Sequence, residues 1–224
     1  MNPAAPCIVQ QASEAVSFVR QRLGHHWVIG APLGLGKPNH LINALYRAAK
    51  ADPGIRLELF TALSLNPPKP TTGLKQRFLG PFLQRHFGDY PRLEYLQDLD
   101  RRQVPSNIHI SEFYFRSGTR LGDRHAQQHY LSSNYTHVAR DMQNRGVNLI
   151  VQMVARHPDR PGHFSLSCNP DVTLDLLQLI PREQLLILLQ VNDALPYMGG
   201  AAEISATVAD LVLEGTEQPL FAVP

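Results

Sequence analysis

The chain has 224 residues, of which 43% are hydrophobic and 18% charged, and its formal net charge is +2. This balance is typical of a globular domain and excludes a disordered chain. No Lys/Arg block indicates a nucleic-acid surface, and no window approaches the roughly 18 consecutive apolar residues of a membrane span. The amino terminus predicts no signal peptide. The two cysteines, Cys7 and Cys168, form no disulfide framework, so we expect a reduced, cytoplasmic protein.

The amino-terminal part of the chain predicts one strand–helix–strand unit. In chain order we expect a helix over 11–23 ended by Gly24, a strand over 27–29, a loop over 30–36, a helix from about Lys37 with Pro38 in its first turn, and a strand over 55–61. Such a unit normally forms a right-handed parallel crossover.

Helices and strands keep alternating through the rest of the chain. We expect a proline-rich connection over 65–74, helices at about 74–87 and 91–102, a strand over 107–115, an irregular segment over 116–133, a helix over 136–144, strands over 147–154 and 163–168, a helix over 171–180 capped by Asn169 or Asp171, and strands over 185–191 and 208–213. Several strands are apolar on both faces. The sequence therefore predicts one α/β domain over 1–224, with an open, mostly parallel sheet and helices on both faces.

The loop 30–36 resembles a phosphate-binding turn, but its spacing is wrong for one. Five residues separate Gly30 from Gly36-Lys37, and Pro38 stands where a P-loop needs Ser or Thr. The dinucleotide pattern fails too, because no Gly lies three residues after Gly36. Two interpretations remain. Free backbone N–H groups could hold an anion or a thioester carbonyl, or the glycines could serve only a tight turn with positive φ.

His125 and His129 would lie on one helical face, at the spacing that zinc proteases use. The general base is missing, because Ala126 stands where those enzymes have Glu. A metal would need a third ligand such as Asp123 or His137. We expect a hydrogen-bonding loop here and no stoichiometric zinc.

No other pattern indicates a nucleophile within this chain. There is no Gly-x-Ser-x-Gly elbow, and neither cysteine lies in a nucleophile motif. Glu112 and Glu203 lie near strand ends without a partner in sequence, so we interpret both as solvated charges.

Three segments that follow strands are rich in glycine or small polar residues: 30–36, 61–64 and 192–200. Ligands of open parallel sheets gather beyond the carboxyl ends of the strands, so parallel strands would bring these segments to one edge. The candidate substrate-binding residues are Gly30, Gly34, Gly36, Thr61, Ser64, Asn192, Gly199 and Gly200.

A series of short segments spans most of residues 29–200. It comprises 29–38 followed by 41–45, then 57–64, then 147–154 with 162–167 and 171–173, and finally Gln190-Val191-Asn192 with Pro196 and Gly200. In order and spacing it resembles the amino-terminal domain of the acetyl-CoA hydrolase / 4-hydroxybutyrate CoA-transferase family. Three positions depart from the family pattern: Tyr197 stands for Arg, Ala201 for Asp and Ser167 for Gly. These departures concern acyl-group contacts rather than the fold.

The resemblance implies transfer or release of CoA through a glutamyl-CoA thioester. The nucleophilic Glu would lie in a second domain beyond residue 224, and this chain would supply one wall of the cleft. The expected partners are an acyl-CoA substrate, a carboxylate acceptor or water, the second domain and a homo-oligomeric copy, with no permanently bound cofactor, no nucleic acid and no membrane. The alternative is a free-standing α/β binding module without catalysis. The acyl group stays open.

Overall fold

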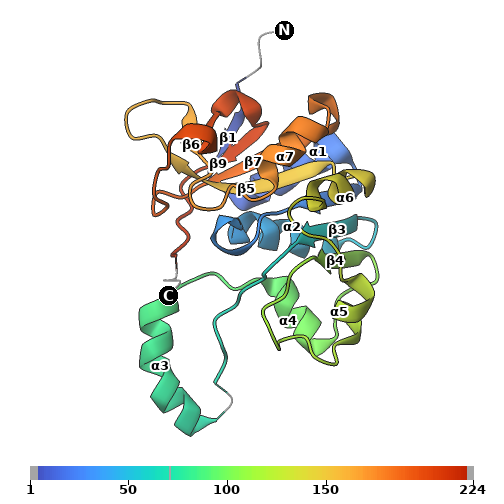
Figure 1. The fold of residues 1–224 in the computed structure, drawn as a ribbon, viewed down its shortest axis with the longest axis vertical. Coiled ribbons are helices and arrows are strands. Elements are labelled where there is room, and N and C mark those ends of the chain that lie inside the picture. Colours follow the sequence, from blue (N-terminus) through green and yellow to red (C-terminus); the bar gives the residue numbers. More distant parts are fainter. Residues whose placement is uncertain (1–4, 71, 221–224) are drawn as a thin grey trace.

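The computed structural model describes residues 5–70 and 72–220 and is built on a twisted central sheet (Figure 1). Seven strands run parallel in the order β1-β9-β7-β5-β2-β3-β4. Their bounds are β1 Cys7–Val9, β2 His26–Gly30, β3 Arg56–Thr61, β4 Ile108–Glu112, β5 Leu149–Arg156, β7 Leu186–Val191 and β9 Leu211–Leu213. Two short strands extend the sheet: β6 His163–Ser165 pairs antiparallel with β5, and β8 Glu203–Ser205 pairs antiparallel with β6. The expected open, mostly parallel sheet is confirmed.

Helices cover both faces of the sheet, also as expected. The helices are α1 Ala12–Leu23, α2 Asn39–Ala51, α3 Gly73–Phe87, α4 Glu94–Arg101, α5 Arg124–His129, α6 Val138–Asn144 and α7 Thr173–Leu179. Successive side chains of a strand point to opposite faces. Ile29 therefore packs in the core under α1, α2 and α4, whereas Val28 packs in the core under α6 and α7.

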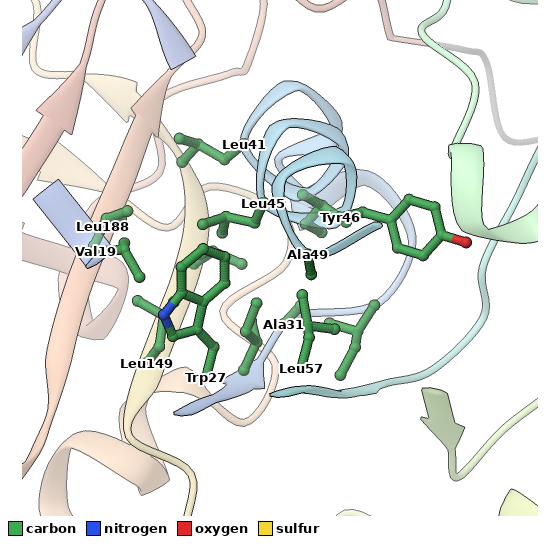
Figure 2. Packing of buried hydrophobic residues seen from close by; sticks show 14 of the residues in the cluster. Val19, Trp27, Ala31, Leu41, Leu45, Tyr46, Ala49, Leu57, Leu149 and Leu188 are labelled. Atoms are coloured by element: carbon green, nitrogen blue, oxygen red, sulfur yellow. The ribbon is translucent and has the colours of Figure 1, made fainter. Parts of the chain in front are cut away.

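Helix α2 shows how the first of these cores is built (Figure 2). Leu41, Leu45 and Ala49 recur at helical spacing and face the sheet, where Trp27 is fully buried beneath them. The Trp27 indole still satisfies its polar atom, because Nε1 donates to the Gly24 carbonyl oxygen over 2.9 Å.

The structure corrects several local expectations. Helix α2 begins at Asn39, with Pro38 as its N-cap instead of a first-turn residue. The segment 116–133 is not irregular throughout, because it contains α5. The strand expected over 163–168 is shortened to β6, and β1 and β8 have no counterpart in the sequence-based prediction. Three-residue strands are too short to produce a recognisable alternation.

Helix α3 lies apart from the rest of the fold on two connecting segments (Figure 1). Not one of its residues is buried, and Leu74, Phe78 and Phe82 expose 79%, 81% and 54% of their surface. We call residues 65–90 the arm. Among the described residues, no helix is long and apolar enough to cross a membrane.

Candidate functional site

Lys37 links two of the three predicted segments at the carboxyl edge of the parallel strands. Its side chain is buried. Its Nζ atom donates to Thr61 Oγ1 over 2.5 Å, to the Ala62 carbonyl oxygen over 3.1 Å and to Ser64 Oγ over 3.3 Å. All three donors of the ammonium are thus used. The loop after β2 is thereby tied to the end of β3.

Burial lowers the pKa of the Lys37 ammonium from 10.5 to about 8, because water no longer stabilises the charge. The negative charges of Glu112 and Asp171 oppose this shift. A buried cation that needs such partners is a recurrent feature of functional sites, although structural ion networks share it.

Ser64 connects Lys37 to a buried carboxylate. Glu112 Oε1 accepts the Ser64 N–H over 3.1 Å and also accepts the Ser64 hydroxyl. The hydroxyl of Tyr95 lies 2.5 Å from Ser64 Oγ, and burial raises the pKa of Tyr95 well above its usual range. We call Lys37, Thr61, Ser64, Tyr95 and Glu112 the edge cluster.

Leu63 precedes Ser64 with a φ of 41°, in the left-handed region that residues other than glycine rarely adopt. Such strain persists only where surrounding contacts hold it, and it is frequent at functional sites. Here Leu63 N–H donates to the Tyr114 carbonyl oxygen over 2.8 Å, and the next residue, Ser64, makes its two hydrogen bonds with Glu112.

The third predicted segment reaches the same edge through Gln218. Asn192 Nδ2 donates to the Gln218 carbonyl oxygen over 2.8 Å. The Gln218 side chain in turn accepts the Asn39 N–H over 2.9 Å and donates to the Lys37 carbonyl oxygen over 3.1 Å. Asn192 therefore lies in one hydrogen-bonded network with the loop after β2.

Two N–H groups of the loop 30–36 that could hold an anion are already used within the fold. Leu33 N–H donates to Asp171 Oδ2 over 2.7 Å, and Gly36 N–H donates to Asn169 Oδ1 over 3.2 Å. Neither Asn169 nor Asp171 caps α7, whose N-cap is Val172. The two side chains that the sequence assigned to a helix cap thus occupy the glycine loop instead.

Each glycine of this loop is favoured at its position for a different steric reason. Gly34 has a φ of 54°, and a side chain at Gly36 would place Cβ 2.9 Å from Cβ of Asn169. Both positions therefore favour glycine for the turn and for close packing. Gly30 ends β2, where a Cβ would lie 3.3 Å from Val147.

Asp171 also has a positive φ, of 47°, and its Oδ1 atom is buried without a hydrogen-bond partner among the described residues. Burial raises the pKa of the Asp171 carboxyl. Burial, reinforced by the nearby Asp171 carboxylate, raises the pKa of Tyr135 to about 12.

Gly199 and Gly200 lie next to the antiparallel strands, away from the edge cluster in the hydrogen-bond network. The adjacent Met198 carbonyl oxygen accepts from Ser165 Oγ of β6 over 2.6 Å. Close by, Tyr197 hydrogen-bonds to Glu203, which also pairs with Arg160 at 2.5 Å. Glu203 is therefore a paired charge and not an isolated one.

His125 and His129 lie on the same face of α5, as expected, and their ring centroids are 4.3 Å apart. His109, rather than Asp123 or His137, is the third group, with its ring 5.6 Å from that of His129. Burial and the neighbouring imidazoles lower the pKa of His129. The described residues contain no group of three or more His, Cys, Asp or Glu side chains arranged to hold a metal ion.

Sequence reasoning missed Lys37 and misjudged Glu112. Lys37 was considered only as a position of the P-loop pattern. Glu112 was interpreted as a solvated charge, yet the exposed fraction of Glu112 is 4%. The available signal was the position of Glu112 at the end of a strand, on the edge where 30–36 and 61–64 were expected to meet.

The fold defined by this sheet is CoA-transferase-like. The chain is similar to RipA from Yersinia pestis, with a TM-score of 0.62 and 20% identity over 97% of this chain and 44% of that chain. It is also similar to a 4-hydroxybutyrate CoA-transferase from Porphyromonas gingivalis, with a TM-score of 0.53 and 17% identity over 97% of this chain and 41% of that one.

This chain thus spans less than half the length of these structural neighbours. Comparison with protein-family models gives no match, and comparison with curated protein sequences gives none either. At these identities the likeness establishes the fold.

Proposed function

We propose that this chain is the amino-terminal part of an acyl-CoA transferase or hydrolase and forms one wall of its active-site cleft. The observation that carries the proposal is the CoA-transferase-like fold over 97% of the chain, together with a polar network at the carboxyl edge of its sheet. Ligands of open α/β sheets bind at that edge.

The chemistry proposed for the whole enzyme is exchange or release of CoA through a glutamyl-CoA thioester. The nucleophilic Glu is assigned to a second domain, and the CoA thioester is a substrate instead of a resident cofactor. This chain contributes the loop 30–36, the segment 61–64 and Asn192, which orient the acyl thioester and exclude water from it.

The test compares residues 1–224 with the same chain joined to a CoA-transferase second domain. We expect the joined protein to move CoA from an acyl-CoA to a carboxylate or to water, and residues 1–224 alone to turn over none. Robust transfer by residues 1–224 would contradict the assignment of the nucleophile. An inactive joined protein that still binds a small ligand stoichiometrically would favour the non-catalytic binding module.

A further inference from the structure

A cavity of about 250 Å³ opens beside the edge cluster, between the end of β4 and the segment that follows it. Its lining is mostly polar and includes Ser64, Asn66, Asp100, Glu112, Arg116 and Arg120. At roughly 30 Å³ per water molecule, this space is large enough for a short-chain molecule of a few heavy atoms.

Glu112 places one free carboxylate oxygen at this cavity. Both hydrogen bonds from Ser64 go to Oε1, which fixes the plane of the carboxylate. Oε2 has no hydrogen-bond partner among the described residues. Because Glu112 lines this open cavity, a ligand ammonium placed there can donate to Oε2, and a hydrogen bond to an ionised carboxylate is one of the stronger kinds.

Arg116 is the cation that remains available on the same lining. Arg120 is already paired, at 3.1 Å with Asp100 and at 3.2 Å with Asp123. The exposed Arg116 guanidinium makes no ion pair with any described residue. A guanidinium without a carboxylate partner is well suited to hold the carboxylate of a ligand.

The charges of the lining add a second constraint. Asp100 and Glu112 offset Arg116 and Arg120, so the lining is neutral overall. A ligand with one positive and one negative end preserves that balance, whereas a simple monocarboxylate adds a net negative charge beside Glu112.

We propose that this cavity binds a short amino carboxylate, with its ammonium group on Glu112 and its carboxylate on Arg116. This assignment goes beyond the proposed CoA chemistry and requires neither CoA nor a second domain.

The test is isothermal titration calorimetry of residues 1–224 with β-alanine, γ-aminobutyrate and δ-aminovalerate, and with butyrate and butylamine as one-ended controls. We expect one amino carboxylate to bind at least about tenfold more tightly than either control, because only it satisfies both charged groups. Equal binding of butyrate, or no binding of any amino carboxylate up to millimolar concentrations, would overturn the proposal.

Two variants test which residue binds which end of the ligand. Arg116→Gln, at an exposed position, should weaken the amino carboxylate about tenfold and leave butylamine unchanged. Glu112→Gln should abolish the preference over butyrate, with circular dichroism to verify folding. Arg77→Gln on the arm is the matched charge control and should bind like the unmodified chain. An unaltered affinity in Arg116→Gln would show that the ligand lies elsewhere, even if Glu112→Gln fails to fold.

Because no CoA is present, this result is independent of the transfer assay. Amino carboxylate binding without CoA transfer would leave this proposal standing and remove the proposed function. CoA transfer by the joined protein without amino carboxylate binding would support the proposed function and overturn the proposal for this cavity.

Discussion

The edge cluster and the arm meet in the sequence at Ser64 and are opposite in burial. Lys37 and Glu112 carry charges in the interior beside Ser64, and a few residues later the arm exposes Leu74, Phe78 and Phe82 to solvent. Globular chains ordinarily do the reverse, and the informative observations are buried polar groups and exposed apolar ones. The two regions adjoin at Ser64, because the chain that leaves β3 passes through Ser64 and then enters the arm (Figure 1).

The two regions are stabilised by different means. The edge cluster is held by hydrogen bonds that link side chains from separate strands, so removing one member leaves others without partners. The arm is attached mainly at its base, where Asn66 and Leu93 exchange two hydrogen bonds of 2.7 and 3.0 Å. Substitutions should therefore be costly in the cluster and nearly neutral on helix α3 of the arm, none of whose residues is buried.

The largest expected effect is at Lys37. Lys37→Met keeps the length of the side chain but removes the donor to Thr61, Ala62 and Ser64 and leaves Glu112 without its nearby positive charge. We expect a loss of about 3–5 kcal/mol in the free energy of unfolding, measured by urea denaturation. Lys75→Met on the arm is the matched control. A change below about 0.5 kcal/mol in both variants would erase the contrast between the regions.

A smaller effect is expected at Gly34, beside the cluster. A β-branched residue at a φ of 54° is strained, so Gly34→Val should cost about 1–2 kcal/mol of stability. If Gly34 also lines the cleft, turnover by the protein joined to its second domain should fall further than the folded fraction does.

Arg77→Ala on the arm is the comparison for Gly34→Val. Lys50→Ala is unsuitable, although Lys50 is exposed, because its ammonium lies 2.5 Å from the buried carboxylate of Asp98. Normal turnover by the folded fraction of Gly34→Val would restrict Gly34 to the turn.

The lowered pKa of Lys37 predicts a pH dependence. Between about pH 8 and 10.5 the unfolded chain binds this proton and the folded chain does not, so folding becomes more favourable as pH rises. Stability relative to Lys37→Met should increase by up to about 1.4 kcal/mol per pH unit in this window and be constant below it. Subtracting the variant removes the contribution of the tyrosines. If the difference in stability between the unmodified chain and Lys37→Met stayed constant from pH 7 to 10, the lowered pKa of Lys37 would be wrong.

The smallest effect is expected on the arm. Phe78→Ala should change the free energy of unfolding by less than about 0.5 kcal/mol, because Phe78 remains 81% exposed in the folded chain. Phe60→Ala in the core should cost about 3–5 kcal/mol. A comparable loss at both positions in a melting experiment would mean that the arm is packed against the fold in solution.

Elements with strong local patterns could be predicted from the sequence. The helix ended by Gly24, the alternating strand that became β3 and the apolar runs of β5 and β7 each bury a periodic set of side chains, so their order also predicted the parallel sheet and its two covered faces. Thr61, Ser64 and Asn192 were placed at the carboxyl edge by the same argument. Gly199 and Gly200 were not brought into that network, because the chain leads from them into β8, which pairs antiparallel with β6.

The sequence by itself determined which faces are apolar and where the strands end, because both depend on residues a few positions apart. Only the tertiary structure decided the partners of the polar side chains. Asp171 and Asn169 fill the glycine loop from more than a hundred residues away, and Lys37 meets Ser64 and Glu112 only after β2, β3 and β4 are aligned. The physical reason is that a buried charge needs partners, and the sheet register that supplies them is set by long-range packing and not by neighbours in sequence.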